Sequence, residues 1–104
     1  MLTVYERKII AAKIISQLGG QKFKVMTGAK DFNTTLTGVS FRIPSKAGKP
    51  NFVQIGLNKN DLYDVEFFRI WGTKVTEISN YSDIYVENLV ELFESETGLY
   101  TKLF

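Results

Sequence analysis

Apolar residues recur at helical spacing at the start of the chain. The positions that share this face are Ile10, Ala11, Ile14, Ile15 and Leu18. Their spacing predicts a helix over about residues 4–18. Thr3 and Glu6 form a capping-box pattern, in which each side chain satisfies a backbone N–H at the other's position, and so predict where the helix starts. Gly19 and Gly20 predict where it ends, because glycine readily adopts the left-handed conformation of a helix C-terminus.

Alternation of apolar and polar residues predicts strands in the middle of the chain. In QKFKVMT, residues 21–27, Phe23 and Val25 fall on one face while Lys22 and Lys24 fall on the other. The same period of two predicts further strands over residues 37–43, 53–57 and 63–68. The turn at residues 71–73 predicts one more strand over residues 74–79. Each pattern has one apolar face, so each strand is expected to cover a core on one side and meet water on the other.

Turn residues and one break in the pattern divide these segments. Loops are predicted by composition at residues 28–31, 58–61 and 71–73. Pro44 ends the strand before it, because proline cannot donate a hydrogen bond to the ladder. Phe67 followed by Phe68 interrupts the alternation, which predicts a β-bulge or burial on both sides.

Helical spacing returns near the C-terminus. The apolar face there comprises Ile84, Tyr85, Val86, Leu89, Val90, Leu92 and Phe93. Asn80 or Ser82 is expected to cap this helix, and Gly98 to end it. The acidic residues of its other face are Asp83, Glu87, Glu91 and Glu94.

The order of these elements predicts an α+β fold. A helix, four or five antiparallel strands and a second helix form a single domain over residues 1–104, with both helices packed on one sheet face. A chain of 104 residues is long enough to bury one core. The aromatic residues expected in that core are Tyr5, Phe23, Phe67 and Phe93.

The composition excludes several kinds of active site. The chain has no cysteine and no histidine, so it forms no disulfide, thiolate nucleophile, Ser-His-Asp triad or ordinary zinc site. Asp61, Asp64 and Glu66 suggest a magnesium site only weakly, because the lysine of a common nuclease signature does not follow them. We therefore expect a protein that is not an enzyme and holds no metal or cofactor. No apolar run is long enough to span a membrane, so no membrane partner is expected either.

The net charge of +2 at pH 7 conceals an uneven distribution. Residues 1–49 hold nine bases and two acids, whereas residues 50–104 hold four bases and nine acids. Such polarity predicts a basic surface for one partner, an acidic surface for another, or two surfaces that meet each other.

The stretch FRIPSKAGKPN, residues 41–51, places glycine before lysine as phosphate-binding loops do. A P-loop needs a glycine five positions before Gly48, where Ile43 stands, and a serine or threonine after Lys49, where Pro50 stands. The stretch is therefore not a nucleotide cradle. Two alternatives stay open: a solvated loop between strands, or a loop whose Lys46 and Lys49 contact the phosphates of a polyanion.

Three stretches of the chain carry a family resemblance. LGGQKFKVMTGAKDF, FRIPSKAGKPN and LNKNDLYDVEFFRIWGTKV resemble a family of small, mostly uncharacterised proteins of phages and other bacterial mobile elements. The resemblance covers most of the chain and rests on turn glycines and strand patterns. It implies a cytoplasmic accessory protein in an infected or element-bearing bacterium, and it carries over no catalytic residue.

The first functional hypothesis is binding of DNA or RNA through a basic sheet face and the loop at residues 46–49. The residues assigned to it are Lys22, Lys24, Arg42, Lys46 and Lys49. Lysine and arginine neutralise backbone phosphates, and a few outward aromatic residues, Phe52, Phe68 and Trp71, offer rings for stacking bases. The alternative explanation is that these charges keep a solvent-exposed sheet face soluble and protect its edge strands from pairing with other chains.

The second hypothesis is a protein-binding module that inhibits or modulates a host protein or defence system. Its contact residues are Glu87, Glu91 and Glu94 on the acidic helix. Glu94 lies near the helix C-terminus, where a negative charge opposes the helix dipole, and this placement favours a basic partner. That partner is a host protein, or the basic first helix, either within the chain or across a homodimer.

Overall fold

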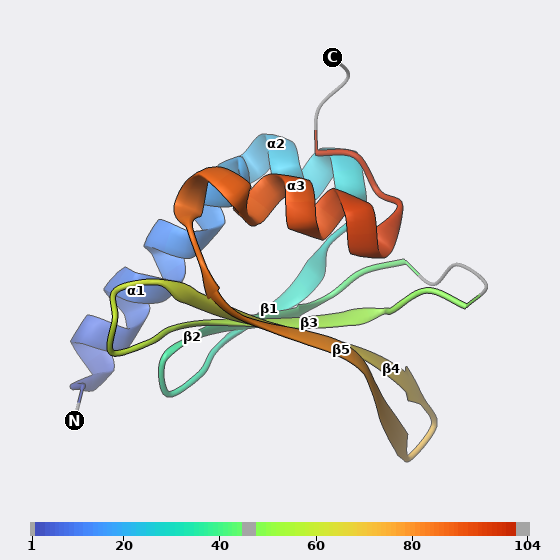
Figure 1. Cartoon of the computed structure of the whole chain (residues 1–104), viewed down its shortest axis with the longest axis horizontal. Helices are drawn as coiled ribbons and strands as arrows, with labels where there is room; N and C mark the ends of the chain where they lie inside the picture. Colours follow the sequence, from blue (N-terminus) through green and yellow to red (C-terminus); the bar gives the residue numbers. More distant parts are fainter. Residues whose placement is uncertain (1, 45–47, 102–104) are drawn as a thin grey trace.

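The computed structural model describes residues 2–44 and 48–101 and confirms the predicted α+β class. Three helices and a five-stranded antiparallel sheet are formed by the described residues. In chain order these are α1 Val4–Leu18, α2 Gly20–Thr27, β1 Lys30–Thr34, β2 Gly38–Arg42, β3 Phe52–Leu57, β4 Tyr63–Trp71, β5 Lys74–Ile84 and α3 Val86–Thr97. The three helices lie on one side of the sheet (Figure 1), and none of the described residues forms a helix on the other side, which we call the open face.

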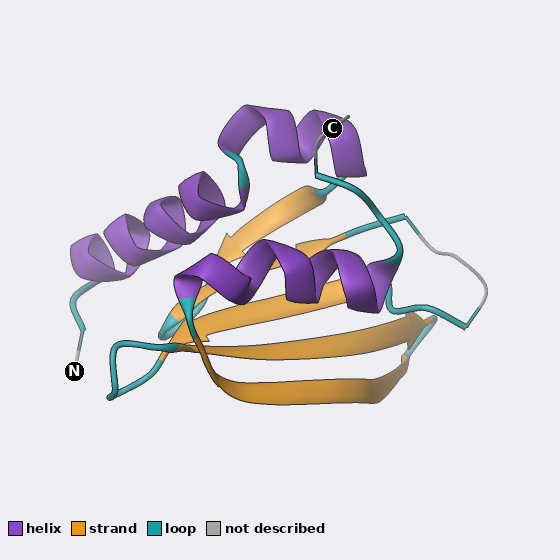
Figure 2. Cartoon of the chain, turned by 45° about the horizontal axis from the view of Figure 1, so that its top comes forward, coloured by secondary structure: helices purple, strands orange, loops and turns teal. Residues whose placement is uncertain are grey.

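The sheet is a meander in which each strand pairs with its neighbours in sequence, in the order β1-β2-β3-β4-β5. Val39 of β2 lies opposite Ile55 of β3, which lies opposite Val65 of β4. All three are buried under the helices. Because side chains alternate between faces along a strand, their sequence neighbours point to the open face. Figure 2 shows α3 crossing above the middle of the sheet.

The first helix begins and ends where the pattern predicts. The Thr3 backbone N–H donates to Glu6 Oε1 at 2.9 Å, and the Glu6 N–H donates to Thr3 Oγ1 at 3.1 Å, which completes the capping box. Gly19 ends the helix with a φ of 131°. Ala11, Ile14 and Leu18 are buried against the sheet, mainly over β2. One expectation fails: Tyr5 is 73% exposed and lies outside the core.

The strand predicted at residues 21–27 is wrong, because this segment is the helix α2. Phe23 and Thr27 are its buried residues, four positions apart, and the Thr27 hydroxyl donates to the Phe23 carbonyl oxygen at 2.7 Å. Val25, expected beside Phe23, is 71% exposed. The pattern over seven residues fits both periods, and packing selects the helix: the Phe23 ring lies 5.6 Å from that of Phe41 and 5.1 Å from that of Phe93, between centroids.

The second correction concerns the start of α3. Neither Asn80 nor Ser82 caps it, because β5 continues to Ile84 and Tyr85 is the N-cap. The predicted C-cap is confirmed, since Gly98 has a left-handed conformation with a φ of 73°. The predicted bulge is confirmed too: the register of β4 and β5 shifts between Phe67 and Phe68.

Candidate functional site

A cross-strand row of side chains stands out on the open face. Lys30 of β1 lies opposite Arg42 of β2, Arg42 lies opposite Phe52 of β3, and Phe52 lies opposite Phe68 of β4. Directly paired residues share a face, and neighbouring strands are about 4.8 Å apart. Two cationic side chains therefore stand next to two aromatic ones. We call these four residues the open-face row.

The aromatic half of the open-face row is a pair of partly exposed rings. Phe52 and Phe68 are both intermediate in burial, and their ring centroids are 6.1 Å apart at an interplanar angle of 62°. Within residues 2–44 and 48–101, no helix lies on this side of the sheet (Figure 1), so no helix covers these partly exposed rings. Aromatic side chains on a sheet face can stack nucleobases.

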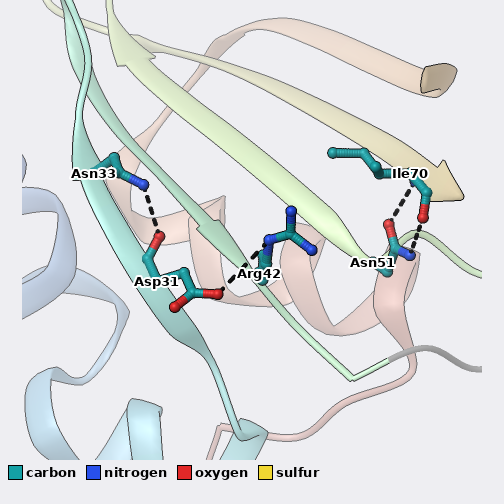
Figure 3. Close-up of polar contacts among 5 residues, drawn as sticks. All are labelled: Asp31, Asn33, Arg42, Asn51 and Ile70. Carbon is teal, nitrogen blue, oxygen red and sulfur yellow. Dashed lines mark hydrogen bonds and ion pairs between the residues drawn. The ribbon is translucent and has the colours of Figure 1, made fainter. Parts of the chain in front are cut away.

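The cationic half is partly neutralised by one acid. Arg42 Nε lies 3.7 Å from Asp31 Oδ2, and both side chains are more than half exposed. Asp31 has a φ of 57°, at a break in the pairing of β1 with β2, and Asn33 Nδ2 donates to its carbonyl oxygen at 3.1 Å. Figure 3 shows the other two guanidinium nitrogens of Arg42 pointing away from Asp31. Arg42 can therefore pair with Asp31 and still donate to an anion.

A clamp holds the start of β3 against β4 and positions Phe52. Asn51 Nδ2 donates to the Ile70 carbonyl oxygen at 2.9 Å, and the Ile70 N–H donates to Asn51 Oδ1 at 2.8 Å (Figure 3). Arg69 Nη1 donates to the Lys49 carbonyl oxygen at 2.7 Å. These bonds fix the backbone of Lys49 beside the open-face row, while its side chain is exposed.

A hollow of about 380 Å³ adjoins the cationic end of the row. Its lining residues are Gly28, Lys30, Arg42, Ile43, Pro44 and Asn51. Two positive side chains border it, so the chemistry of this end suits an anionic group such as a phosphate.

The opposite end of the open face is acidic. Phe68 lies opposite Glu77, and Glu66 lies opposite Asn80. Asp64, Glu66 and Glu77 line a common hollow of about 240 Å³. Burial raises the pKa of the Glu66 carboxyl, and the nearby Glu77 and Asp64 charges raise that pKa further. The open face is thus divided into a basic end at β1 and β2 and an acidic end at β4 and β5.

Not all of the predicted basic residues lie on this face. Lys22 and Lys24 belong to α2, on the helix side of the sheet, and this corrects their predicted place on a strand. Lys24 Nζ lies 4.8 Å from the centroid of the Phe32 ring, a cation–π contact. Arg42 and Lys49 lie together at one end of the sheet, and Lys46 falls outside the described residues.

The acidic residues of the second hypothesis are divided as well. Glu87 and Glu91 are exposed on α3. Glu94 is half-buried, and its Oε2 accepts hydrogen bonds from the Thr101 N–H at 2.9 Å and the Thr101 hydroxyl at 3.1 Å. This contact occupies Glu94 within the chain. Across residues 2–44 and 48–101, no ion pair joins a base of α1 to an acid of α3, so the pairing considered within the chain is not formed.

Sequence reasoning missed Lys30, the outermost residue of the row. The composition of residues 28–31 predicts a loop, so the sequence pattern does not assign Lys30 to a strand or to the sheet face that carries Arg42. The irregularity after Lys30, where Asp31 takes a positive φ, hides the strand pattern. Phe52 and Phe68 were visible, but only strand pairing shows that they are neighbours.

Comparison with known proteins adds no further information. No family model, curated protein or solved structure matches the chain. The resemblance to phage and mobile-element proteins therefore stays a prediction. In the described part of the chain, no helix is both long and apolar enough to cross a membrane.

Proposed function

We propose that the protein is a non-enzymatic accessory protein that binds single-stranded nucleic acid on the open face of its sheet. One observation carries this proposal: the open-face row places two cations directly beside two partly exposed aromatic rings. The two interactions that single-strand binders combine, phosphate neutralisation and base stacking, are thus available within one row.

Each half of the row has a distinct task in this proposal. Lys30 and Arg42 neutralise backbone phosphates at the hollow beside them, with Lys49 close by. Phe52 and Phe68 stack bases. A duplex already stacks its bases internally and offers no free base face, so the rings favour a single strand. The acidic end beyond Phe68 repels phosphates and keeps the strand over β1 to β4.

The proposal revises the first hypothesis in its residues. The proposed contact residues still include Arg42 and Lys49. They now also include Lys30, Phe52 and Phe68. They no longer include Lys22 and Lys24, which lie on the helix side. Docking on a basic host protein through Glu87 and Glu91 stays the alternative, supported by the exposure of both acids.

Binding of a short single-stranded oligonucleotide, followed by fluorescence anisotropy at low salt, tests the proposal. Phe52→Leu keeps an apolar side chain but removes the stacking ring, and should weaken binding by about fivefold or more, since each base stack contributes roughly 1–3 kcal/mol. Arg42→Gln should weaken binding and flatten its salt dependence, because one phosphate contact is lost.

Lys22→Gln is the matched control for Arg42→Gln, because it removes the same charge from the helix side of the molecule. It should leave affinity nearly unchanged. Absence of binding at low salt, or equal losses in the Lys22 and Arg42 variants, would show that the open-face row is not the contact.

A further inference from the structure

The outer surface of α1 carries a row of exposed side chains, two large and apolar and two small, opposite the face that packs on the sheet. Tyr5 is 73% exposed and Ile9 is 50% exposed, and Ala12 and Ser16 follow on the same side, both exposed. We call Tyr5, Ile9, Ala12 and Ser16 the outer stripe. A lone exposed apolar side chain needs no explanation, but a row at helical spacing on a helix that already buries its other face does.

The spacing of the outer stripe is that of a coiled-coil seam. Steps of four, three and four residues place these positions alternately at the d and a sites of a heptad. Large residues occupy the first half of the stripe and small residues the second half. If a second copy of α1 packs antiparallel, Tyr5 meets the partner's Ser16 and Ile9 meets the partner's Ala12. Each bulky side chain then lies against a small one, which lets the two helices approach closely.

The charges beside the stripe are self-complementary in the same arrangement. Glu6 and Lys13 both follow d positions, so they lie on one flank of the helix, seven residues apart. In an antiparallel pair this flank faces its own copy, and Glu6 lies opposite the partner's Lys13 at both ends of the contact. Both side chains are exposed. Glu6 Oε1 accepts the Thr3 N–H, and the second carboxylate oxygen is left for Lys13 of the partner subunit.

We propose that the protein forms a symmetric homodimer through antiparallel packing of α1 against α1 along the outer stripe. The occupant is a second copy because size and charge complementarity both arise from this helix alone. One helix pair buries less than the roughly 1,200 Å² of a standard stable interface, so the dimer is weak and depends on concentration. Figure 2 shows α1 on the helix side of the sheet. A contact through α1 therefore leaves the open face of each copy uncovered.

Sedimentation velocity over a wide concentration range tests this dimer. The unmodified chain should shift from monomer to dimer as concentration rises. Ile9→Glu should weaken association by about tenfold or more, because a charge replaces a buried apolar side chain at the centre of the contact. Val25→Glu is the matched control: Val25 is 71% exposed, apolar and on α2, away from the stripe.

Two charge-reversal variants test the proposed contact between Glu6 and Lys13 of the partner subunit. Lys13→Glu places like charges opposite each other at both ends of the contact and should weaken the dimer, whereas Lys8→Glu makes the same charge change on the other flank and should have a smaller effect. A monomer at every concentration overturns the proposal, as does a dimer that survives Ile9→Glu or that is equally weakened by Val25→Glu. Circular dichroism confirms that each variant is folded, since all the substituted side chains are exposed.

Discussion

At the scale of single residues, the acidic end of the open face brings carboxylates close together, and their mutual repulsion opposes folding. Partial burial of Glu66 on β4 raises the pKa of its carboxyl, and the nearby Glu77 and Asp64 raise it further. A carboxyl whose pKa is raised on folding binds more protons in the folded chain than in the unfolded chain. Stability therefore falls as pH rises from the ordinary carboxyl pKa through the raised one. We therefore expect ionisation of Glu66 at neutral pH to lower the stability of the fold.

Removing the charge of Glu66 should raise the free energy of unfolding at neutral pH. Glu66→Gln keeps the size of the side chain and removes its charge. The variant should be more stable than the unmodified chain at neutral pH by up to about 1 kcal/mol, since solvent screens charges that are partly exposed. The gain should disappear below the ordinary carboxyl pKa. Urea unfolding at neutral pH and at a pH below the ordinary carboxyl pKa measures this gain in stability. Glu91→Gln, at an exposed position on α3, is the control. A variant that is less stable at neutral pH would contradict the assigned repulsion.

At the scale of elements, α2 shows how little a short periodic pattern decides. Seven residues contain both an alternation of Phe23 with Val25 and a four-residue step from Phe23 to Thr27. The structure contains the helix, because Phe23 is buried between Phe41 and Phe93 while Val25 is exposed to solvent. The longer helices α1 and α3 leave no such ambiguity, because three or more turns distinguish the two periods.

A pair of alanine substitutions distinguishes the two elements by experiment. Of Phe23 and Val25, only Phe23 is buried in a helix, so Phe23→Ala should lower the free energy of unfolding by about 3–5 kcal/mol. Val25→Ala should change it by less than about 0.5 kcal/mol, as expected for an exposed position. In a strand with both residues inward, both substitutions would be costly. Chemical denaturation gives the answer, and a large loss in Val25→Ala would refute the helix.

At the scale of the whole molecule, the two proposals place different partners on opposite sides. In these proposals, the helix side associates with a second copy through α1, and the sheet side binds nucleic acid through the open-face row. A dimer built in this way presents two binding faces, so a long strand that reaches both is bound more tightly than a short one. The proposed function gives the uneven charge of the chain a role: Lys30 and Arg42 on β1 and β2 would bind phosphate, and the acids on β4 and β5 would limit where the nucleic-acid strand runs.

This coupling gives a prediction that neither proposal makes alone. Ile9→Glu should leave the affinity for a short oligonucleotide unchanged, because the open-face row is intact. The same variant should lose at least about tenfold in apparent affinity for a strand long enough to span both faces, since avidity is lost. Anisotropy titrations with the two lengths make the comparison. An equal loss for both lengths would show that Ile9 acts through the fold and not through the dimer.

Local patterns were sufficient for much of this protein. The capping box at Thr3 and Glu6, the glycine ends of α1 and α3, the bulge at Phe67 and the α+β class all follow from residues close together in the sequence. These features depend on short-range hydrogen bonds and on one apolar face per element, and both are visible in the chain itself. The absence of cysteine and histidine needed no structure either.

Tertiary structure alone decided the rest. Only strand pairing brings Lys30, Arg42, Phe52 and Phe68 into one row, because the register joins residues that lie far apart in the chain. Only packing of Phe23 turned residues 20–27 into a helix and moved Lys22 and Lys24 away from the open face. Burial of one side of α1 left the outer stripe exposed. A sequence pattern shows which residues share a face, whereas the fold determines what that face meets.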